Sequence, residues 1–167
     1  AMSSPLLATR FFAPRLRADA VARPRLLKRL LAGLDGKLTL VAAPAGFGKS
    51  TLLAALLTAS PWPVAWLSLA AEDQQPLHFL RYLVAALQRL CPARLTVTSQ
   101  LLQLPDAPPP ERVMLQLLNE LAALDEHLVL VLDDYHLTDN RVVDNLLQQL
   151  LEQLPPTLTL VIATRED

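Results

Sequence analysis

The feature that most constrains this chain is an apolar run that leads directly into a loop containing glycine and lysine. Residues 37–42 are predicted to form a β-strand, and Ala43–Ser50 follow as Ala-Pro-Ala-Gly-Phe-Gly-Lys-Ser. The chain has only four glycines, and two of them fall in this loop. A helical pattern over residues 49–59 begins inside it. A strand, a glycine-bearing loop and a helix in this order are typical of a phosphate-binding loop.

The residue types of the loop suit a nucleoside triphosphate. Phosphates need a concave ring of backbone N–H groups, here expected from four consecutive residues: Ala45, Gly46, Phe47 and Gly48. Lys49 is predicted to reach the β- and γ-phosphates, and the Ser50 hydroxyl to ligate Mg²⁺. Thr51 is predicted to lie near the α-phosphate. A tight strand-to-helix turn would also need glycine, but the lysine and hydroxyl that follow in order favour phosphate binding.

Two adjacent carboxylates follow the predicted strand 127–132. Asp133 and Asp134 would lie where the carboxyl end of a parallel strand opens onto a ligand crevice. Asp133 is predicted to hold Mg²⁺ through a water molecule, and Asp134 to orient or activate the attacking water. A solvated strand end is the alternative, and the upstream phosphate loop favours the metal site. Arg165, after the predicted strand 157–163, would lie near the same edge, where a cation could sense the γ-phosphate. An arginine that faces solvent is the alternative.

Strand and helix patterns alternate along the chain, which predicts an α/β fold with a parallel sheet covered by helices on both faces. A further strand is predicted over residues 63–69. Helices are predicted over residues 24–34, 49–59, 76–90, 111–124 and 140–154. Residues 92–110, rich in proline, are predicted to be an irregular exposed connection. The predicted domain organisation is an extended N-terminal arm over residues 1–22 and a nucleotide-binding domain over residues 23–167.

The composition narrows the classes of function. With 167 residues, 52% of them hydrophobic, the chain can bury a core. A net charge of −1 is unlike a nucleic-acid platform, so this fragment alone is expected to bind no specific DNA. No apolar run approaches the about 20 residues of a membrane span. Cys91 is the single cysteine, which excludes an internal disulfide and fits the reducing cytoplasm.

Several motifs together resemble the N-terminal nucleotide-binding domain of MalT-type transcription activators. These are large ATP-binding regulators of the LuxR class, within the STAND group of signalling P-loop NTPases. The resemblance spans nearly the whole chain from Arg10 onward. It rests on five segments of the sequence: Arg23–Leu26, Leu40–Leu52, Val64–Leu69, Val131–His136 and Thr164–Arg165.

The resemblance implies a cytoplasmic ATP/ADP switch with Mg²⁺ and slow hydrolysis. It implies that Arg23 lies near the adenine and that Arg165 is the sensor arginine. It also implies an inducer, self-association, and DNA binding through a C-terminal domain absent from this chain. Two other functions remain open from the residues: a metabolic P-loop ATPase or kinase, and an inert interaction module.

The resemblance further implies the strand order 2-3-4-1 in chain numbering, with a fifth strand beside the first. The chain ends before a fifth strand could form, so we expect a C-terminally truncated sheet with residues 37–42 at its edge. An apolar edge strand invites pairing with another chain. We expect this edge to be covered by residues 3–12 or by a second copy of the chain.

Overall fold

The protein is built around a four-stranded parallel sheet. The computed structural model describes residues 6–12, 38–43, 53–55, 58–70, 75–134 and 140–165, with the backbone alone at 38–43 and 164–165. The strands, in chain order, are β1 (Leu38–Ala43), β2 (Val64–Ser68), β3 (Leu128–Asp133) and β4 (Leu158–Arg165). In space they run β2-β3-β4-β1, and every neighbouring pair is parallel. The predicted order 2-3-4-1 is confirmed.

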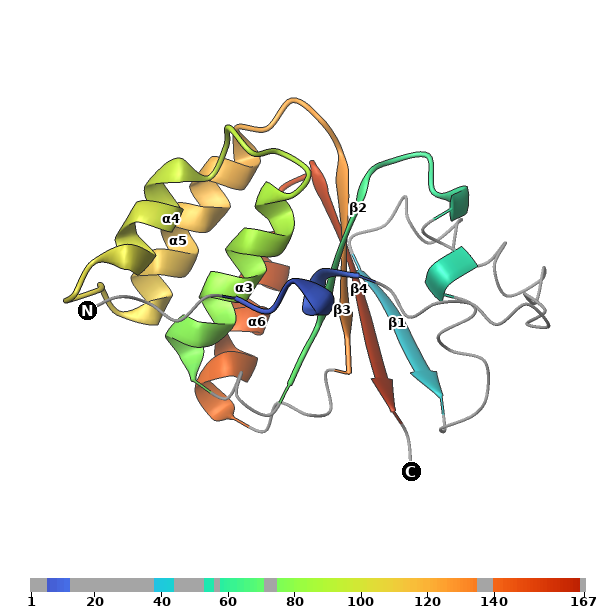
Figure 1. Ribbon diagram of the computed structural model, residues 1–167, viewed down its shortest axis with the longest axis horizontal. Coiled ribbons are helices and arrows are strands. Elements are labelled where there is room, and N and C mark those ends of the chain that lie inside the picture. The colour runs from blue at the N-terminus through green and yellow to red at the C-terminus, as the bar shows by residue number, and fades with distance from the viewer. Residues whose placement is uncertain are drawn as a thin grey trace.

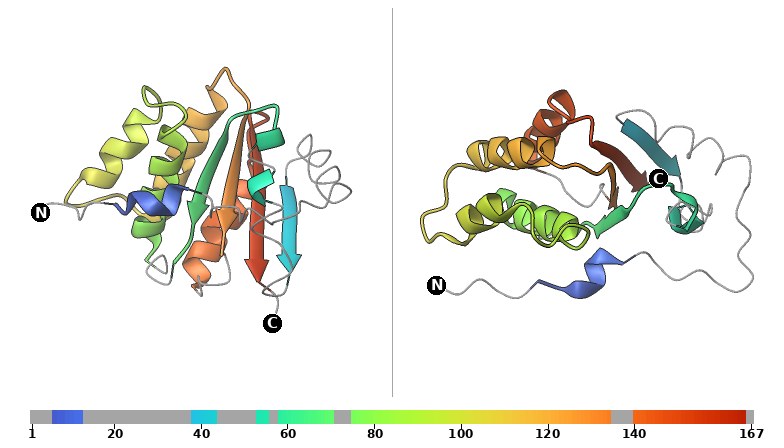
Figure 2. Two further views of the ribbon diagram at one scale, coloured as in Figure 1. Left: turned by 45° about the vertical axis from the view of Figure 1, so that its right-hand side comes forward. Right: turned by 90° about the horizontal axis from the view of Figure 1, so that it is seen from above.

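Helices cover both faces of this sheet (Figures 1 and 2). One face carries a layer of four helices: α3 (Pro76–Gln88), α4 (Thr96–Gln103), α5 (Pro110–Ala122) and α6 (Arg141–Glu152). Residues 53–55 and 58–59 are also helical and lie on the opposite face, in teal in Figure 1. The predicted α/β architecture is therefore correct. The predicted helix 24–34 falls outside the described residues.

The central strand explains why the sheet must be covered twice. All six residues of β3 are buried, and five of them are the unbroken apolar run Leu128–Leu132. A strand that alternated polar and apolar residues would leave one face for water, whereas this one has no face to expose. β3 lies between β2 and β4, so its edges are hydrogen-bonded as well. The apolar run thus selects the interior of a two-sided sheet.

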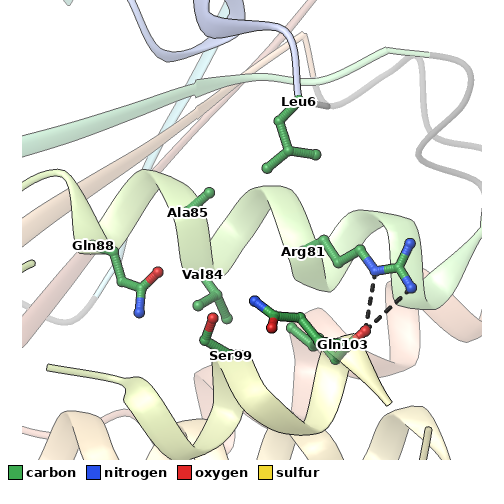
Figure 3. A pocket seen from close by; sticks show the side chains of 8 residues that line it. Leu6, Arg81, Val84, Ala85, Gln88, Ser99 and Gln103 are labelled. Atoms are coloured by element: carbon green, nitrogen blue, oxygen red, sulfur yellow. Dashed lines mark hydrogen bonds between the residues drawn. The ribbon is translucent and has the colours of Figure 1, made fainter. Parts of the chain in front are cut away.

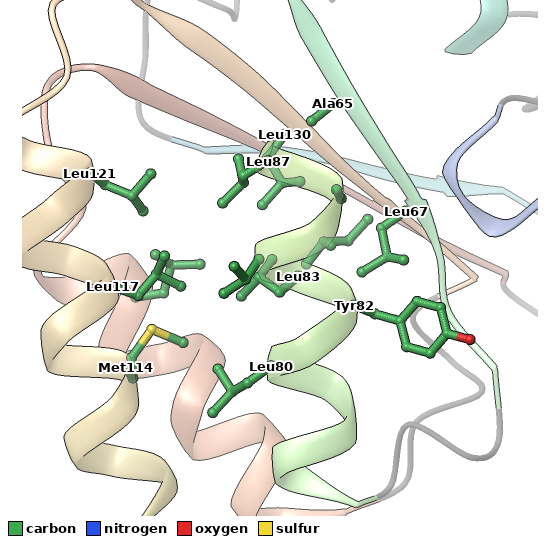
Figure 4. Packing of buried hydrophobic residues seen from close by; sticks show 14 of the residues in the cluster. Ala65, Leu67, Leu80, Tyr82, Leu83, Leu87, Met114, Leu117, Leu121 and Leu130 are labelled. Atoms are coloured by element: carbon green, nitrogen blue, oxygen red, sulfur yellow. The ribbon is translucent and has the colours of Figure 1, made fainter. Parts of the chain in front are cut away.

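Leucine dominates the contact between the helical layer and the sheet. Figure 4 shows Leu83 and Leu87 of α3 between Leu117 of α5 and Leu130 of β3. Each of these four side chains has no exposed surface. Burying one such side chain contributes roughly 1.5–3 kcal/mol relative to leaving it in water. This layer is the main core of the described part of the chain.

Helix α4 was not predicted, because residues 92–110 were expected to be irregular. Its sequence begins Thr96-Val97-Thr98, and β-branched residues lower helix propensity. The residue before it, Leu95, has a left-handed backbone with φ of 60°, which is costly for a branched side chain. Local propensity therefore gives little indication of this helix.

Tertiary contacts hold α4 in place. Glu120 of α5 accepts hydrogen bonds from both the backbone N–H and the hydroxyl of Thr98, which is completely buried. At the other end, Arg81 of α3 donates two hydrogen bonds, of 3.3 and 3.1 Å, to the carbonyl of Leu102 (Figure 3). A guanidinium at a helix C-terminus satisfies a carbonyl that the helix itself leaves unpaired. The two polar contacts dock α4 onto its neighbours.

The start of α6 is set by a side-chain cap whose contribution can be measured. The side chain of Asn140 accepts hydrogen bonds from the backbone N–H groups of Val142, at 2.8 Å, and Val143, at 3.3 Å. Replacing Asn140 by alanine should lower the free energy of unfolding by about 1 kcal/mol, because two N–H groups lose their acceptor. Urea denaturation measures this. Asn145→Ala, at an exposed site within the same helix, is the control and should change stability by less than about 0.5 kcal/mol.

Residues 1–22 were predicted to form an extended arm, but the described residues 6–12 include a helical turn that packs against the rest of the domain. Ala8–Phe11 form the 3₁₀-helix η1, which lies beside β2 and α3 (Figure 2). Residues 6–12 thus lie at the β2 edge of the sheet. The prediction that residues 3–12 cover β1 is wrong for residues 6–12, because β1 is at the opposite edge. Among the described residues no strand pairs with the outer side of β1, and its cover by a second copy stays a prediction.

Cys91 packs as a small side chain at the end of α3. It is partly buried, and its thiol donates a hydrogen bond of 3.2 Å to the carbonyl of Leu87. Burial raises the pKa of the Cys91 thiol, Arg94 acts in the opposite direction, and Glu126 raises the pKa further. A thiol with a raised pKa is a poor nucleophile at neutral pH. This environment suits a packing role for Cys91.

Within the described residues, no helix combines the length and the apolar character needed to cross a membrane.

Candidate functional site

The carboxyl ends of the four parallel strands lie at one edge of the sheet, at the bottom in Figure 1. The register shows which strand ends are neighbours. Ala43, the last residue of β1 and the first of the predicted phosphate loop, pairs with Arg165 at the end of β4. Ser68, the last residue of β2, pairs with Asp133 at the end of β3. The sheet therefore brings the loop's first residue, Arg165 and the acidic strand end to a common edge.

Asp133 is held firmly at this edge. It is 3% exposed, and its backbone carbonyl accepts a hydrogen bond of 2.9 Å from the N–H of Leu69. Its carboxylate oxygen Oδ1 accepts a second one, also of 2.9 Å, from the N–H of Asp134. A carboxylate that accepts a backbone N–H is restricted in orientation before any ligand arrives. Asp133 thus has the fixed geometry that a metal ligand needs.

Asp134 turns the chain away from the strand. Its φ of 57° lies in the left-handed region, which aspartate tolerates better than most residues. The turn lets the N–H of Asp134 bond the neighbouring carboxylate instead of continuing the β-ladder. Asp134 is partly exposed, in contrast to Asp133. The two carboxylates therefore have different environments, one suited to holding a ligand and the other in contact with solvent.

Most of the predicted nucleotide contacts lie outside the described residues. This holds for Arg23 and for the loop residues Ala45, Gly46, Phe47, Gly48, Lys49, Ser50 and Thr51. The structure describes Arg165 by its backbone, which places the residue beside Ala43. What the described part contributes is the frame: the strand that delivers the loop, and the neighbouring strand ends.

The donor chemistry of this edge fits Mg²⁺. Among the described residues there is no group of three or more His, Cys, Asp or Glu side chains that could hold a metal ion. Mg²⁺ beside a nucleotide needs only one or two carboxylates, because phosphates and waters complete its shell. Asp133 supplies a hard oxygen donor at a fixed position. The described residues are thus consistent with a nucleotide-linked magnesium site and do not form a cage of their own.

Sequence reasoning did not single out Ser68. It ends β2 directly beside Asp133, and its hydroxyl accepts a hydrogen bond of 2.9 Å from the indole N–H of Trp66. The signal was present, because Ser68 is the last residue but one of the predicted strand 63–69, and parallel strands end at one edge. The predicted order 2-3-4-1 placed this strand beside the third, but the register that pairs Ser68 with Asp133 was missing, because the residues of β2 do not specify it.

Comparison with known proteins gives the family. The model of the AAA ATPase domain matches residues 21–162. The chain belongs to the AAA ATPase domain family. The match spans both β1 and the acidic end of β3, so this AAA domain includes the whole of the candidate site except Arg165. Nucleotide binding is the property that this domain class implies.

The resemblance to MalT-type regulators is confirmed at the level of sequence. This AAA domain is 35% identical over 160 residues to the HTH-type transcriptional regulator MalT of Serratia proteamaculans (strain 568). It is 34% identical over 160 residues to MalT of Cronobacter sakazakii (strain ATCC BAA-894). Each alignment covers 96% of this chain and 18% of the relative. The chain therefore spans less than a fifth of the length of these regulators.

Two solved structures support the fold. Cdc6p from Pyrobaculum aerophilum has a TM-score of 0.57 and 13% identity, over 93% of this chain and 41% of that one. A chain of the Drosophila ORC structure bound to DNA has a TM-score of 0.55 and 15% identity, over 98% of this chain and 48% of that one. At such low identity the likeness concerns the arrangement of helices and strands. It supports the P-loop ATPase architecture of this AAA domain.

Proposed function

We propose that the chain is the ATP/ADP-binding switch domain of a MalT-like, signal-responsive transcriptional activator, with slow ATP hydrolysis. The observation that carries the proposal is the arrangement of the strand ends. Arg165 at the end of β4 pairs with Ala43 at the end of β1, and Asp133 ends β3, the neighbour of β4 on its other side. This is the frame on which a phosphate loop, a metal-binding acid and a γ-phosphate-sensing cation can act together. The similarity to MalT over 96% of the chain supports the regulatory role.

In this proposal the loop supplies most of the binding energy. Backbone N–H groups between Ala45 and Gly48 surround the phosphates, and Lys49 bonds the β- and γ-phosphate oxygens. Thr51 contacts the α-phosphate, and Arg23 lies near the adenine. Mg²⁺, bound with the nucleotide, neutralises part of the phosphate charge. Asp133 and Ser50 are the residues proposed to hold that ion.

Hydrolysis is proposed to be slow because the chain's own residues complete only part of the catalytic set. Asp134, partly exposed beside Asp133, orients an attacking water. Arg165 provides one cation near the γ-phosphate. Efficient phosphoryl transfer generally adds a further arginine from another domain or subunit, worth about 10³–10⁵ in rate. Because hydrolysis is slow, such a site keeps ATP or ADP bound for long enough that the bound nucleotide can set the state of the regulator.

The longer protein is proposed to act in the cytoplasm and to use this switch to control DNA binding. In this proposal, further domains of the longer protein bind an inducer and, through a C-terminal domain, DNA. The longer protein also self-associates. The fragment by itself is proposed to bind no specific DNA, since its net charge is −1.

One structural observation weighs against a metabolic ATPase or kinase. Such an enzyme would need a lid over its second substrate, and the proline-rich stretch 92–110 is a candidate for that lid. These residues instead contain α4, which packs on α3 and α5 through Thr98 and Leu102. A helix docked onto the helical layer does not have the freedom of a lid. The contact supports the switch.

Calorimetry tests the proposal. Titration with ATP and with ADP, each with Mg²⁺ and with EDTA, should show binding of both nucleotides that Mg²⁺ tightens. A single-turnover measurement with ATP should give a rate far below the roughly 10 s⁻¹ typical of enzymes. A chain that binds neither nucleotide would be an inert module, and a rate near the enzymatic value would support the metabolic function instead.

A further inference from the structure

The N-terminal segment, defined here as residues 6–12, is anchored on one buried aromatic side chain. Tyr82 of α3 is 3% exposed, and its hydroxyl oxygen accepts a hydrogen bond of 3.1 Å from the N–H of Leu7. The ring of Phe11 lies 5.8 Å from the Tyr82 ring, centroid to centroid. The guanidinium carbon of Arg10 lies 3.7 Å from the same ring centroid. Three successive contacts therefore fix this segment on α3.

Arg10 also reaches the sheet. Its Nε donates a hydrogen bond of 3.0 Å to the backbone carbonyl of Ser68, the last residue of β2. β2 is the edge strand on this side, so its outward carbonyls have no partner within the sheet. A planar guanidinium can stack on an aromatic ring and donate in its own plane at the same time. Arg10 thus joins α3 to the end of β2.

The end of β2 is in turn bonded to Asp133. Ser68 and Asp133 are partners in the parallel register, and the N–H of Leu69 donates to the carbonyl of Asp133 at 2.9 Å. The carbonyl of Ser68, which accepts from Arg10, and the N–H of Leu69 belong to the same peptide group. The same rigid peptide unit therefore accepts from Arg10 and donates to Asp133. A short covalent and hydrogen-bonded path links the N-terminal segment to the acidic strand end.

We propose that Arg10 is a positioning residue for the magnesium site. By fixing the Ser68–Leu69 peptide, Arg10 holds the main chain at Asp133 and so the direction of the Asp133 carboxylate. The inference rests on the proposed function, in which Asp133 holds Mg²⁺. The proposal connects the N-terminal segment to the nucleotide site through the main chain. It predicts that Arg10 affects the contribution of Mg²⁺ rather than nucleotide binding itself.

The measurement is the factor by which Mg²⁺ tightens ADP binding, from calorimetry with Mg²⁺ and with EDTA. Arg10→Met keeps much of the stem but removes the Nε donor and the charge. It should reduce this factor about tenfold, since groups that orient metal ligands typically contribute 10–100-fold to metal affinity and Arg10 acts through the main chain. The affinity for ADP in EDTA should stay within about twofold, because the phosphate loop is untouched.

Arg89→Met is the matched control. Arg89 also stacks on the N-terminal segment, with its guanidinium carbon 5.4 Å from the Phe11 ring centroid and 4.6 Å from that of Phe12. It is exposed at the end of α3 and belongs to neither strand end. Loss of its packing should lower the melting temperature, as loss of Arg10 should, without changing the Mg²⁺ factor.

Arg10→Lys is measured beside them and serves as the test if Arg10→Met does not fold. It keeps the charge, but an ammonium group cannot lie flat on Tyr82 and donate along the ring plane, so the Mg²⁺ factor should fall by less than in Arg10→Met. Two results would overturn the positioning role and leave the proposed function standing. In the first, the wild type and the Arg10 variants have equal Mg²⁺ factors. In the second, the Arg10 and Arg89 variants lose equal parts of the Mg²⁺ factor. A wild-type chain that binds no ADP would instead overturn the proposed function.

Discussion

Replacing Lys49 by alanine is expected to weaken binding of ATP by at least about a hundredfold, and binding of ADP, which has no γ-phosphate, by about tenfold or more. The reason is that Lys49 is the one side chain of the predicted loop that brings a full positive charge to the phosphates. Each charge-assisted hydrogen bond contributes about 1.5–3 kcal/mol, and the ammonium group is predicted to form two of them. Calorimetric titration in Mg²⁺ would measure the loss, and the melting temperature of the nucleotide-free chain should not change.

The control for Lys49 is another lysine. The chain has three, and Lys37 precedes β1, whereas Lys49 follows it. The predicted phosphate loop follows the carboxyl end of β1. Lys37 lies at the amino end of this strand, so it cannot reach the phosphates that Lys49 binds. Lys37→Ala should therefore bind nucleotide as the wild type does. Unchanged affinity in Lys49→Ala, with correct folding, would remove the phosphate loop from the proposed function.

A second large effect is expected in the core. Leu117→Ala should lower the free energy of unfolding by about 2–5 kcal/mol, because the lost methyl groups leave a cavity that rigid neighbours do not fill. Leu117 has no exposed surface and lies among the leucines between α5, α3 and the sheet (Figure 4). A domain of this size has a total stability of about 5–15 kcal/mol, so the variant would be close to unfolding at elevated temperature.

The same helix offers the matched control. Leu115 is 46% exposed, and Leu115→Ala should change the free energy of unfolding by less than about 0.5 kcal/mol. Urea denaturation of the two variants compares a buried and an exposed leucine with the same change in helix propensity. Similar losses in both would mean that α5 is not packed as the structure has it.

Patterns within single segments account for what could be predicted. The strands were expected at 37–42, 63–69, 127–132 and 157–163, and they lie at Leu38–Ala43, Val64–Ser68, Leu128–Asp133 and Leu158–Arg165. Apolar runs bounded by proline, glycine or charge are local signals, so they can be read without knowledge of the fold. The strand order was predicted from the resemblance to MalT-type regulators, because the residues of β4 do not indicate that this strand lies between β1 and β3.

The candidate site divides in the same way. Asp133 and Asp134 could be predicted because they directly follow an apolar strand. Arg165 was placed only at the edge in general, and its pairing with Ala43 required the register of β4 on β1. The left-handed backbone of Asp134, and the hydrogen bond that this gives to Asp133, also had no signal in the sequence.

By itself the sequence determined the alternation of strands and helices, the burial of β3 and the residue types of the nucleotide site, because each depends on neighbours along the chain. Only the tertiary structure decided where α4 forms and where the N-terminal segment docks. Those two depend on contacts between residues distant in the sequence, among them Thr98 with Glu120 and Arg10 with Ser68. A weak local preference yields to such contacts once burial makes an unpaired polar group costly.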